Sequence, residues 1–524
     1  MPEQRKFRAI KGTRDILPPD SALWNWFEKT AREVMESYNF GEIRTPIFEE
    51  TELFARSIGG ETDVVSKEMY TFADHSLSHL EWTRNTILVR RSAHDDPIDV
   101  KILIQLVDSL VSQAEAATSE GEMPKTPDNA RALDRLRALS EATLLVPQTA
   151  AMGKEEFELC ANQIRAAVGA LKFGDLITLR PEATASVVRA YIEHGMQMRP
   201  GDQKLYYIGP MFRRERPQKG RYRQFYQIGA EVLGTSDAPA IDAELIEMLT
   251  VLLEHCQIEK YTLLINSIGC ANCRPKYVEL LRAELRKPEI YERLGADSKR
   301  RVETNPLRVM DSKLPEEQEI IEKLPKISEH LCDDCKTHYE KLKKELDLRK
   351  VPFTESPRLV RGLDYYMRTT FEITSPILGA QNALCGGGRY DGLVELLGGP
   401  KGIKGIGFAL GEDRFIDAIQ EAKKVHPTRT ADVFIAWMGE SAYPVAVRLA
   451  RVLRGEKHIV ELPPVEMKFR KALERADKAG ARCVLIIGDD EIASKQLTVK
   501  RLADGQQEKI AEDQLVNYFA SKSN

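Results

Sequence analysis

The sequence predicts an α+β protein in which helices flank an antiparallel sheet, helical segments interrupt that sheet, and a smaller α/β domain follows it. Three observations favour this fold class. Short apolar strands alternate with turn residues between Leu176 and Leu233, which is typical of antiparallel hairpins. Two long stretches, 76–172 and 275–350, have helical periodicity. After residue 430, strands and helices alternate as they do in α/β domains.

The composition is that of an ordinary globular protein, with 42% of the 524 residues hydrophobic and 30% charged. These values exclude a disordered tail protein, a collagen-like repeat and a disulfide-rich miniature. A chain of this length suggests about three domains. The formal net charge is −4, so a nucleic-acid partner would have to be bound by local basic clusters and not by the field of the whole chain.

The sequence carries no recognisable targeting or membrane segment. Residues 1–13 lack an apolar signal core, and no apolar run approaches the ~18 residues of a membrane span. Eight cysteines are too few for a secreted disulfide framework. We therefore expect a cytoplasmic protein without a membrane partner, whose cysteines are free thiols or metal thiolates.

The amino-terminal segment predicts a turn, a helix and a strand in that order. Turn residues at Lys11–Asp20 precede a helix whose apolar positions recur on one face, at residues 24, 27, 31 and 34. A strand is predicted at Ile43–Phe48, and its proline, Pro46, favours an edge or an interface over a central position.

Residues 76–172 predict an unusual helical insertion within a catalytic sheet domain formed by 1–75 and 173–424. Apolar residues at 103, 106, 107, 110 and 111, and again between 157 and 171, recur at helical spacing. The segment is far longer than an ordinary loop. We favour a tolerated surface insertion over a second catalytic function, because long surface insertions cost little closure entropy.

A basic hairpin is the first strong functional feature. Strands are predicted at Leu205–Gly209 and Tyr222–Leu233, and the segment between them, Arg213–Arg223, holds six basic residues and one acid. Guanidinium groups bind phosphates through planar, bidentate donors and stack on aromatic rings. The hairpin therefore indicates an anionic ligand such as a nucleotide, while a solvated charged surface is the alternative.

Acidic and amide residues lie close to this hairpin in the sequence. Glu182 and Thr184 precede it, and Gln227 and Glu231 follow it. Gln227 and Glu231 are four residues apart in a predicted strand, so they lie on the same face. Carboxylates beside arginines suit an ammonium group and a second polar group, as in an amino acid. An ion-paired sheet surface is the alternative.

Residues 266–350 predict a second, helical insertion domain that contains two Cys-x-x-Cys pairs. The four cysteines are Cys270, Cys273, Cys332 and Cys335. Paired thiolates at this spacing are typical of a structural zinc site. Because the linker between the pairs is longer than in a compact zinc ribbon, reduced thiols without metal remain the alternative.

Strands are predicted again after this insertion, at Leu359–Val360 and Thr370–Thr374, followed by the triple glycine Gly386–Gly388 and by Gly405–Gly411. The glycines would let the backbone approach a ligand or form a bulge. The carboxy-terminal domain, 430–524, predicts four strands and two helices in alternation. The strands are Val433–Ala436, Ile459–Leu462, Val484–Ile487 and Leu497–Val499, and the helices are Ala442–Leu453 and Lys468–Ala479.

Several of these segments together resemble the histidyl-tRNA synthetase family of class II aminoacyl-tRNA synthetases. The segments are Leu179–Thr184, Met211–Gln227, Leu359–Tyr366, Gly405–Arg414, Lys11–Pro18 and Arg44–Pro46. The resemblance covers nearly the whole chain apart from 76–172, and Arg361–Tyr366 is its most specific part. It implies the class II antiparallel sheet and an anticodon-binding domain at 430–524.

The resemblance also implies a histidine site. Glu182, Thr184 and Gln227 would hold the α-amino group of histidine. Glu231 and Tyr366, with Tyr365 nearby, would meet the imidazole, and Tyr390 is a further candidate. Ala183, Arg213 and Arg361 are also implied in the histidine site, and Ala183 stands where the family usually has glycine. A pocket that hydrogen-bonds both ring nitrogens rejects amino acids that lack them by about 10⁴-fold.

ATP, bound with Mg²⁺, is implied as the second substrate. Arg213 would bind the α-phosphate, Arg414 the γ-phosphate end, and Arg221 lies in the same basic hairpin. Arg361 would act with Arg213 as a catalytic cation at the reacting centre. Phosphoryl chemistry of this kind depends on positioning and charge stabilisation more than on acid–base catalysis.

The expected activity is histidine–tRNA ligation: L-histidine is activated by ATP to histidyl-adenylate and transferred to the 3′ end of tRNA(His), with AMP and pyrophosphate released. The resemblance implies a homodimer. Two other functions share the fold, namely a regulatory paralogue of the histidine-biosynthesis phosphoribosyltransferase and a sensor of uncharged tRNA. The paralogue typically lacks the terminal domain and the full set of ATP-binding arginines, which this chain carries.

Overall fold

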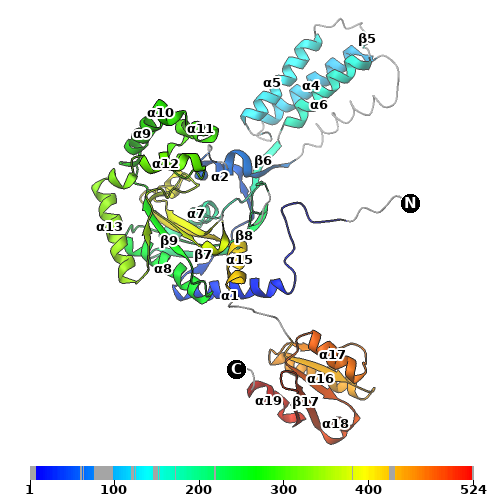
Figure 1. Ribbon diagram of the computed structural model, residues 1–524. Coiled ribbons are helices and arrows are strands. Elements are labelled where there is room, and N and C mark those ends of the chain that lie inside the picture. Colours follow the sequence, from blue (N-terminus) through cyan, green and yellow to red (C-terminus); the bar gives the residue numbers. More distant parts are fainter. Residues whose placement is uncertain are drawn as a thin grey trace. The chain divides into compact units, whose positions relative to one another are not determined.

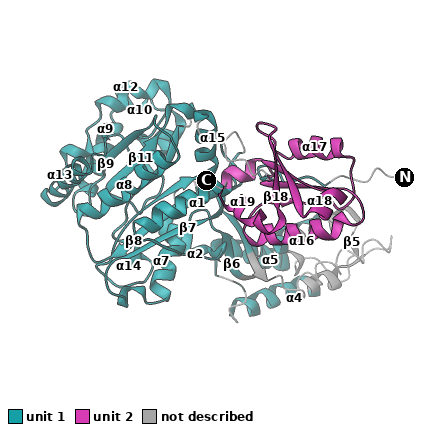
Figure 2. Cartoon of the chain, turned by 90° about the horizontal axis from the view of Figure 1, so that it is seen from below, with its two compact units in different colours: residues 1–16, 25–425 teal, residues 17–24, 426–524 magenta. Residues whose placement is uncertain are grey.

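The computed structural model describes residues 7–59, 62, 64–75, 98–119, 123, 125–144, 151–152, 154–171, 173–216, 220–379, 382–423 and 431–521. The chain forms two compact units (Figures 1 and 2). The first comprises residues 1–16 and 25–425, and the second comprises 17–24 and 426–524. The predicted linker at 423–430 lies almost entirely outside the described residues.

The first unit is built on an eight-stranded sheet of order β1-β7-β8-β13-β12-β11-β9-β10 (Figure 1). Its central strands pair antiparallel, and only the edge strands β1 and β10 pair parallel to their neighbours. The predicted hairpin forms as two long adjacent strands. The bounds are β1 Gly41–Glu42, β7 Gln203–Phe212, β8 Gln224–Gly234, β13 Lys404–Gly411, β12 Ala383–Arg389, β11 Met367–Thr374, β9 Thr262–Ser267 and β10 Thr354–Glu355.

Helices cover this sheet, as the α+β prediction requires. Helix α8 (Pro239–His255) packs against α13 (Asp333–Leu348), which also contacts β9 and β11. Helix α15 (Glu412–Ala422) begins directly after β13 and packs against β8 and β13. Its Phe415 stacks on Phe27 of α1 (Asp20–Ser37), with ring centroids 5.1 Å apart. The sheet core is apolar, with Ile265, Phe371 and Phe408 fully or almost fully buried.

A smaller sheet of order β2-β6-β3 carries the first helical insertion. Strands β3 (Tyr70–His75) and β6 (Phe173–Leu179) are antiparallel neighbours, so residues 76–172 leave and re-enter the fold at the end of one strand pair. The described helices of the insertion are α4 (Val100–Ser119), α5 (Pro127–Leu144) and α6 (Lys154–Ala170), which lie side by side (Figure 1). Their shared core includes Val107, Leu136 and Ile164. The helical prediction is confirmed for these ranges.

The second insertion is a group of short helices between β9 and β10. Its helices are α9 (Arg274–Leu285), α10 (Pro288–Tyr291), α11 (Ala296–Thr304), α12 (Pro315–Lys323) and α13. The charged helical character predicted for 275–350 is therefore present. Asn266 and Ser267 belong to β9, so the helical part begins later than the predicted boundary at 266.

The second unit has a five-stranded sheet of order β15-β14-β16-β17-β18. Its strands are β14 (Val433–Trp437), β15 (Val460–Glu461), β16 (Cys483–Ile487), β17 (Gln496–Arg501) and β18 (Gln507–Ala511), and its helices are α16 (Ala442–Gly455), α17 (Phe469–Lys478), α18 (Asp489–Ser494) and α19 (Leu515–Ser521). All six elements predicted in this domain form. Strand β18 has no counterpart in the sequence prediction because its side chains are half-buried or exposed and lack apolar alternation.

Two predicted strands are wrong. Ile43–Phe48 is not one strand, because β1 ends at Glu42 and β2 (Phe48–Glu50) begins only after an irregular link. Within that link the carbonyls of Thr45 and Pro46 accept hydrogen bonds from the guanidinium of Arg180, so a side chain replaces the ladder that proline interrupts.

Leu359–Val360 is also irregular rather than a strand. The carbonyl of Leu359 accepts a hydrogen bond of 2.9 Å from the side-chain amide of Asn266. None of the described helices is both long enough and apolar enough to cross a membrane.

Candidate functional site

A cavity of about 440 Å³ opens where the long strands β8, β12 and β13 meet the basic hairpin and the loop 361–366. Most of the sequence-predicted site residues line it. Those that do are Glu182, Thr184, Arg213, Arg221, Gln227, Arg361, Tyr365, Tyr366 and Arg414. Ala183, Glu231 and Tyr390 are not in its lining and are fully or almost fully buried behind it.

Glu182 lies at one end of this cavity and caps a helix. Its two carboxylate oxygens accept hydrogen bonds from the backbone N–H groups of Thr184 (2.7 Å) and Ala185 (3.0 Å), at the start of α7 (Thr184–Glu193). Burial raises the pKa of Glu182, although these hydrogen bonds oppose the shift. The carboxylate is therefore held rigidly while it still has lone pairs for an ammonium group.

Glu231 forms the floor beneath this end of the cavity. It is 0% exposed, and both of its oxygens accept hydrogen bonds, from the hydroxyls of Thr184 (2.7 Å) and Tyr390 (2.6 Å). Burial raises the pKa of Glu231 to about 8, although the two hydrogen bonds lower it. Thr184 thus connects the cavity surface to a buried carboxyl group.

Three tyrosines form an aromatic wall beside these carboxylates. The ring of Tyr365 lies 4.7 Å from that of Tyr366 and 5.8 Å from that of Tyr390, measured between centroids. Burial raises the pKa of all three phenols, so they stay neutral hydrogen-bonding groups near neutral pH. A planar heterocycle with polar ring atoms fits such a wall.

Glycines in β12 and β13 make the room that these side chains occupy. A Cβ atom at Gly407 would overlap the carboxylate of Glu231, and one at Gly386 would overlap the guanidinium of Arg361. The glycine-rich strands therefore accommodate site side chains directly. The triple glycine is evident in the sequence, but this purpose is not, because the side chains that face the glycines are distant in the sequence.

Arg361 lies near the middle of the cavity. Its Nη1 forms a 2.7 Å ion pair with Oε2 of Glu372, a residue of β11 that sequence reasoning did not single out. The guanidinium is only 20% exposed, so it is fixed between a carboxylate and the backbone of Gly386. The alternation of Glu372 with buried Phe371 and Ile373 was the signal that could have revealed it.

The other end of the cavity is strongly basic, and Arg213 lies where that end meets Glu182. Arg213 donates a hydrogen bond to the carbonyl of Pro181 (3.0 Å) and lies over the ring of Phe225. Arg414 donates to the carbonyl of Ala383 (3.0 Å), and Arg221 pairs with Glu215.

The closeness of these guanidinium groups affects the pKa of Arg414. Burial lowers the pKa of Arg414, and the positive charges of Arg221 and Arg213 contribute to this shift while Glu215 opposes it. The lining here carries the guanidiniums of Arg213, Arg221 and Arg414, and Glu215 and Glu372 are the carboxylates that act on Arg414. With its three guanidiniums, this end of the cavity suits a polyanion.

The amino-terminal segment reaches this basic end. Arg14 forms an ion pair of 2.5 Å with Asp413 and lies 4.5 Å over the ring of Tyr222. Backbone N–H groups of Arg223 and Gln224 donate to the carbonyl of Gly12. These contacts hold one strand of the hairpin, and they explain why a turn-forming segment far away in the sequence belongs to the site.

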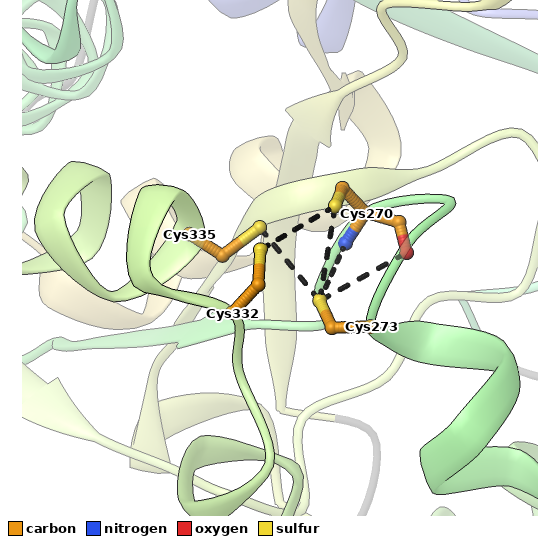
Figure 3. A group of neighbouring side chains, drawn as sticks. All are labelled: Cys270, Cys273, Cys332 and Cys335. Carbon is orange, nitrogen blue, oxygen red and sulfur yellow. Dashed lines mark hydrogen bonds between the residues drawn. The ribbon is translucent and has the colours of Figure 1, made fainter.

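Outside the cavity, the two Cys-x-x-Cys pairs come together. Their Sγ atoms all lie within 4.8 Å of one another (Figure 3). Cys270 lies 3.8 Å from Cys273 and 3.7 Å from Cys332, and Cys273 lies 3.8 Å from Cys335. A tetrahedron with metal–sulfur bonds of 2.3 Å has edges of about 3.8 Å, so the donor set fits a zinc ion.

Comparisons with known proteins agree with the resemblance seen in the sequence. The family model described as Histidyl-tRNA synthetase matches residues 169–414, and the one described as Anticodon binding domain matches 432–522. Histidine--tRNA ligase from Koribacter versatilis is 45% identical over 516 residues, covering 98% of this chain and 96% of the relative. The same-named protein from Solibacter usitatus is 43% identical and covers 99% and 100%.

A solved structure gives the same result. Apo S. aureus histidyl-tRNA synthetase is similar to 98% of this chain, over 100% of its own length, with a TM-score of 0.67 and 32% identity. The identity and the coverage of both chains are sufficient for assignment. The chain belongs to the histidyl-tRNA synthetase family.

Proposed function

We propose that this protein is a histidine–tRNA ligase, which activates L-histidine with ATP and transfers it to the 3′ end of tRNA(His). The observation that carries the proposal is a single cavity with two chemically distinct ends. One end holds buried carboxyl and phenol groups, and the other holds three arginines. A substrate with an ammonium and a polar ring fits the first, and a nucleoside triphosphate fits the second.

At the first end, Glu182, Thr184 and Gln227 bind the α-amino group of histidine. The imidazole lies against Tyr365 and Tyr366, above the buried Glu231. Two observations support this assignment. The cavity is lined by Glu182, Thr184, Gln227, Tyr365 and Tyr366, and the hydroxyl of Thr184 donates a hydrogen bond to Glu231.

Tyr390 is the one tyrosine of the aromatic wall that does not line the cavity, and it fixes the second oxygen of Glu231. Ala183 acts only through the backbone, since it is fully buried just before α7. These two residues are therefore proposed to shape the histidine pocket without lining it.

At the second end, Arg213 binds the α-phosphate, and Arg221 and Arg414 bind the β- and γ-phosphates of ATP. Planar, permanently charged guanidiniums suit this role. Mg²⁺ would be bound together with ATP and prefers carboxylate and phosphate oxygens, and Glu372 and Glu215 are two of the carboxylates in the lining that could hold it. When bound, the ion screens charge on the triphosphate.

Arg361 lies between the two ends, where the reacting atoms meet. A carboxylate oxygen of histidine attacks the α-phosphorus, the bond to the bridging oxygen breaks, and pyrophosphate leaves. In the second step a ribose hydroxyl of tRNA attacks the acyl carbonyl and AMP leaves. Arg213 and Arg361 stabilise the negative charge that develops at the α-phosphate, which is where preorganised cations contribute most.

The second unit is proposed to bind the anticodon region of tRNA(His). The match of 432–522 to the anticodon-binding family supports this role. A local basic surface is available on α17, where Arg470 and Lys471 are exposed. The domain division stated from the sequence remains part of the proposal: 1–75 and 173–424 catalytic, 76–172 and 266–350 inserted, and 430–524 for tRNA.

We also propose a homodimer that works in the cytoplasm. The small sheet and Ile47, the residue before β2, present apolar side chains to solvent: Ile47 is 43% exposed, Phe48 51% and Phe72 45%. A second copy would cover them. All eight cysteines are free thiols, which suits a reducing compartment. Analytical ultracentrifugation of the native chain and of Phe72→Asp tests the dimer, because the variant should be monomeric.

A structural zinc ion at Cys270, Cys273, Cys332 and Cys335 completes the proposal. The support is the near-tetrahedral spacing of the sulfurs and two backbone N–H groups aimed at them, Cys270 N to Sγ of Cys273 (3.2 Å) and Asn272 N to Sγ of Cys270 (3.4 Å). Such N–H groups stabilise bound thiolates.

Histidine-dependent exchange of labelled pyrophosphate into ATP tests the central proposal. Exchange with histidine and with no other amino acid is expected. Histidine binding without exchange would instead indicate the regulatory paralogue, and binding of uncharged tRNA without exchange would indicate a sensor.

A further inference from the structure

We infer that the four-cysteine cluster is a positioning site for histidine binding, and that it acts through the next residue, Arg274. The inference rests on the proposed zinc site and on the proposed histidine activation. It adds a physical connection between them: occupancy of the metal site sets the affinity for histidine by holding the loop 361–366 in place.

The connection begins at the cluster. Cys270 and Cys273 lie on the turn between β9 and α9, and Arg274 is the first residue of that helix. The backbone N–H of Arg274 donates to the carbonyl of Cys270 (2.9 Å), so Arg274 belongs to the same turn as the two thiols. A metal ion that fixes Cys273 therefore fixes the origin of the Arg274 side chain.

In this turn the backbone of Gly269 lies close to the sulfur of Cys273. Gly269 has a left-handed φ of +72°, and a Cβ atom there would lie 2.8 Å from Sγ of Cys273. Its carbonyl accepts a 2.8 Å hydrogen bond from the N–H of Arg368, which follows the site loop. Bulk at this position would displace Cys273 and strain the backbone.

From this turn the guanidinium of Arg274 reaches the site loop. It donates hydrogen bonds to the carbonyl of Tyr366 (2.5 Å) and to the carbonyl of Asp364 (3.4 Å). The loop forms no ladder at these residues, so the two carbonyls depend on such partners. Arg274 is thus attached to the loop that carries Arg361, Tyr365 and Tyr366 into the cavity.

The second Cys-x-x-Cys pair connects the cluster to helix α13. Cys332 and Cys335 lie at the start of α13, which packs against β9 and β11. Four bonds to one ion would tie this helix to the turn that carries Arg274. Without the ion, the two pairs would meet through the sulfur contacts of 3.7 and 3.8 Å that join Cys270 to Cys332 and Cys273 to Cys335 (Figure 3). Loss of metal should therefore loosen the turn, and Tyr365 and Tyr366 with it.

The experiment measures metal content and histidine binding in the same full-length preparations. Zinc is quantified by mass spectrometry, and histidine affinity is measured by calorimetry, which requires no catalysis. Michaelis constants for histidine and for ATP come from pyrophosphate exchange. The variants are Cys332→Ser, which removes one half-buried ligand, and Arg274→Ala, which leaves all four ligands. Cys160→Ser and Arg286→Ala are the matched controls, far from the loop in sequence and without contacts to it.

Native protein should hold one zinc per chain. Cys332→Ser should lose it and bind histidine about tenfold more weakly, since charge-assisted hydrogen bonds to the loop are weakened. Arg274→Ala should keep its zinc and show the same ~tenfold loss. In both variants the Michaelis constant for ATP should change less than about twofold, and the controls should match the native protein.

A double variant separates a shared mechanism from two independent ones. Removing a ligand in the Arg274→Ala background should weaken histidine binding by less than about twofold more, because both changes act on the same contact. If Cys332→Ser does not fold, stripping native protein with a zinc chelator replaces it in the same comparison.

Three results would overturn the inference: native protein without zinc, zinc-free protein that binds histidine normally, or Arg274→Ala with unchanged histidine affinity. Failure of the proposed function would look different, because the native chain would then give no histidine-dependent exchange whatever its zinc content.

Discussion

The two ends of the cavity differ in the burial and the charge of the side chains that form them. At the histidine end, Glu231 is 0% exposed and its pKa is raised to about 8 by burial. At the proposed phosphate end, Arg221 is 47% exposed, Glu215 forms ion pairs with Arg213 and Arg221, and Glu215 and Glu372 both act on Arg414. One end buries its carboxyl group in a fixed hydrogen-bond network, while the other gathers three guanidinium groups in the cavity lining.

The difference teaches how one cavity can combine selectivity with reactivity. A buried, fully hydrogen-bonded network distinguishes ligands by shape and by donor pattern, since a ligand that leaves it unpaired is penalised. An open cationic end binds any triphosphate and lowers the barrier by charge stabilisation. Substitutions at the two ends should therefore change different measurable quantities.

The largest expected effect is at the boundary between the two ends. Arg361→Ala should lower the rate of histidyl-adenylate formation by roughly 10²–10³-fold, because one preorganised cationic donor contributes about 3–4 kcal/mol to such a barrier. Affinity for histidine should change much less. Single-turnover kinetics and calorimetry measure the two quantities separately.

Arg361→Lys is the matched control, because it keeps the positive charge but not the geometry of the guanidinium. It should recover part of the rate, because lysine keeps the charge but loses the planar fork that pairs with Glu372. A near-normal rate of adenylate formation in Arg361→Ala would refute the role given to this residue.

The next effect tests the buried end. Glu231→Gln should lower kcat/KM for histidine by about 100-fold, because an amide NH₂ then faces one of the hydroxyl donors of Thr184 and Tyr390 and the network must rearrange. The Michaelis constant for ATP should be nearly unchanged. Pyrophosphate exchange at varied histidine and varied ATP provides both values.

The same variant has a stability effect of known sign. The pKa of Glu231 in the folded protein is about 8, above that of an unfolded carboxyl, so its stabilising contribution is complete below about pH 4 and is lost as pH rises to about 8. Glutamine does not titrate. Relative to native protein, Glu231→Gln should gain up to ~1.4 kcal/mol in unfolding free energy per pH unit across this window.

Denaturant unfolding at pH 5 and pH 8 measures that slope. Glu182 and Glu412 have raised pKa values as well and remain in both proteins, so the difference between the two proteins isolates Glu231. An unchanged pH dependence would mean that Glu231 is ionised in the folded protein.

A smaller effect should follow from filling the space under Arg361. Gly386→Ala places a methyl group where the guanidinium lies, and overpacking of this kind costs about 1–3 kcal/mol. We expect adenylate formation to slow by about 10- to 30-fold, because Arg361 must move away from Glu372. Stopped-flow measurement of adenylate formation checks this.

Gly41→Ala is the control, since nothing lies within 4 Å of a Cβ atom at that position. It should leave the rate unchanged. Equal effects of the two substitutions would show that backbone disturbance, rather than displacement of Arg361, explains the loss.

The fold was largely predictable because its elements follow local rules. Strand alternation located β7, β8 and four of the five strands of the second unit, and helical spacing located α4 and α6. The failures at Ile43–Phe48 and Leu359–Val360 have one cause. In both segments, side chains of distant residues, Arg180 and Asn266, take the backbone groups that a strand would pair.

The site was predictable where its residues share a strand or a motif, as Gln227 and Glu231 do. It was not predictable where a contact joins distant segments. Arg14 with Asp413, Arg361 with Glu372 and Arg274 with Tyr366 are of this kind. Periodicity says which face a side chain lies on, but it does not say which remote group that face will meet.

The smallest effect on the reaction rate is expected for the largest change in the sequence, the removal of the first insertion. Replacing residues 78–170 with a short glycine–asparagine turn should alter the rate of tRNA aminoacylation by less than about threefold, because β3 and β6 are already antiparallel neighbours that a hairpin turn can join. The described helices of the segment also have a core of their own, so their removal takes few contacts from the sheet. Steady-state aminoacylation, with circular dichroism to verify folding, measures this.

The deletion also sharpens the comparison between the two ends of the cavity. None of the described residues of 78–170 lines the cavity, so we expect histidine and ATP kinetics in pyrophosphate exchange both to remain native. A folded deletion variant with normal exchange but lost aminoacylation would place the function of the segment in tRNA binding. A folded variant that loses exchange as well would mean that the segment supports the cavity itself, and the interpretation as a tolerated insertion would then be wrong.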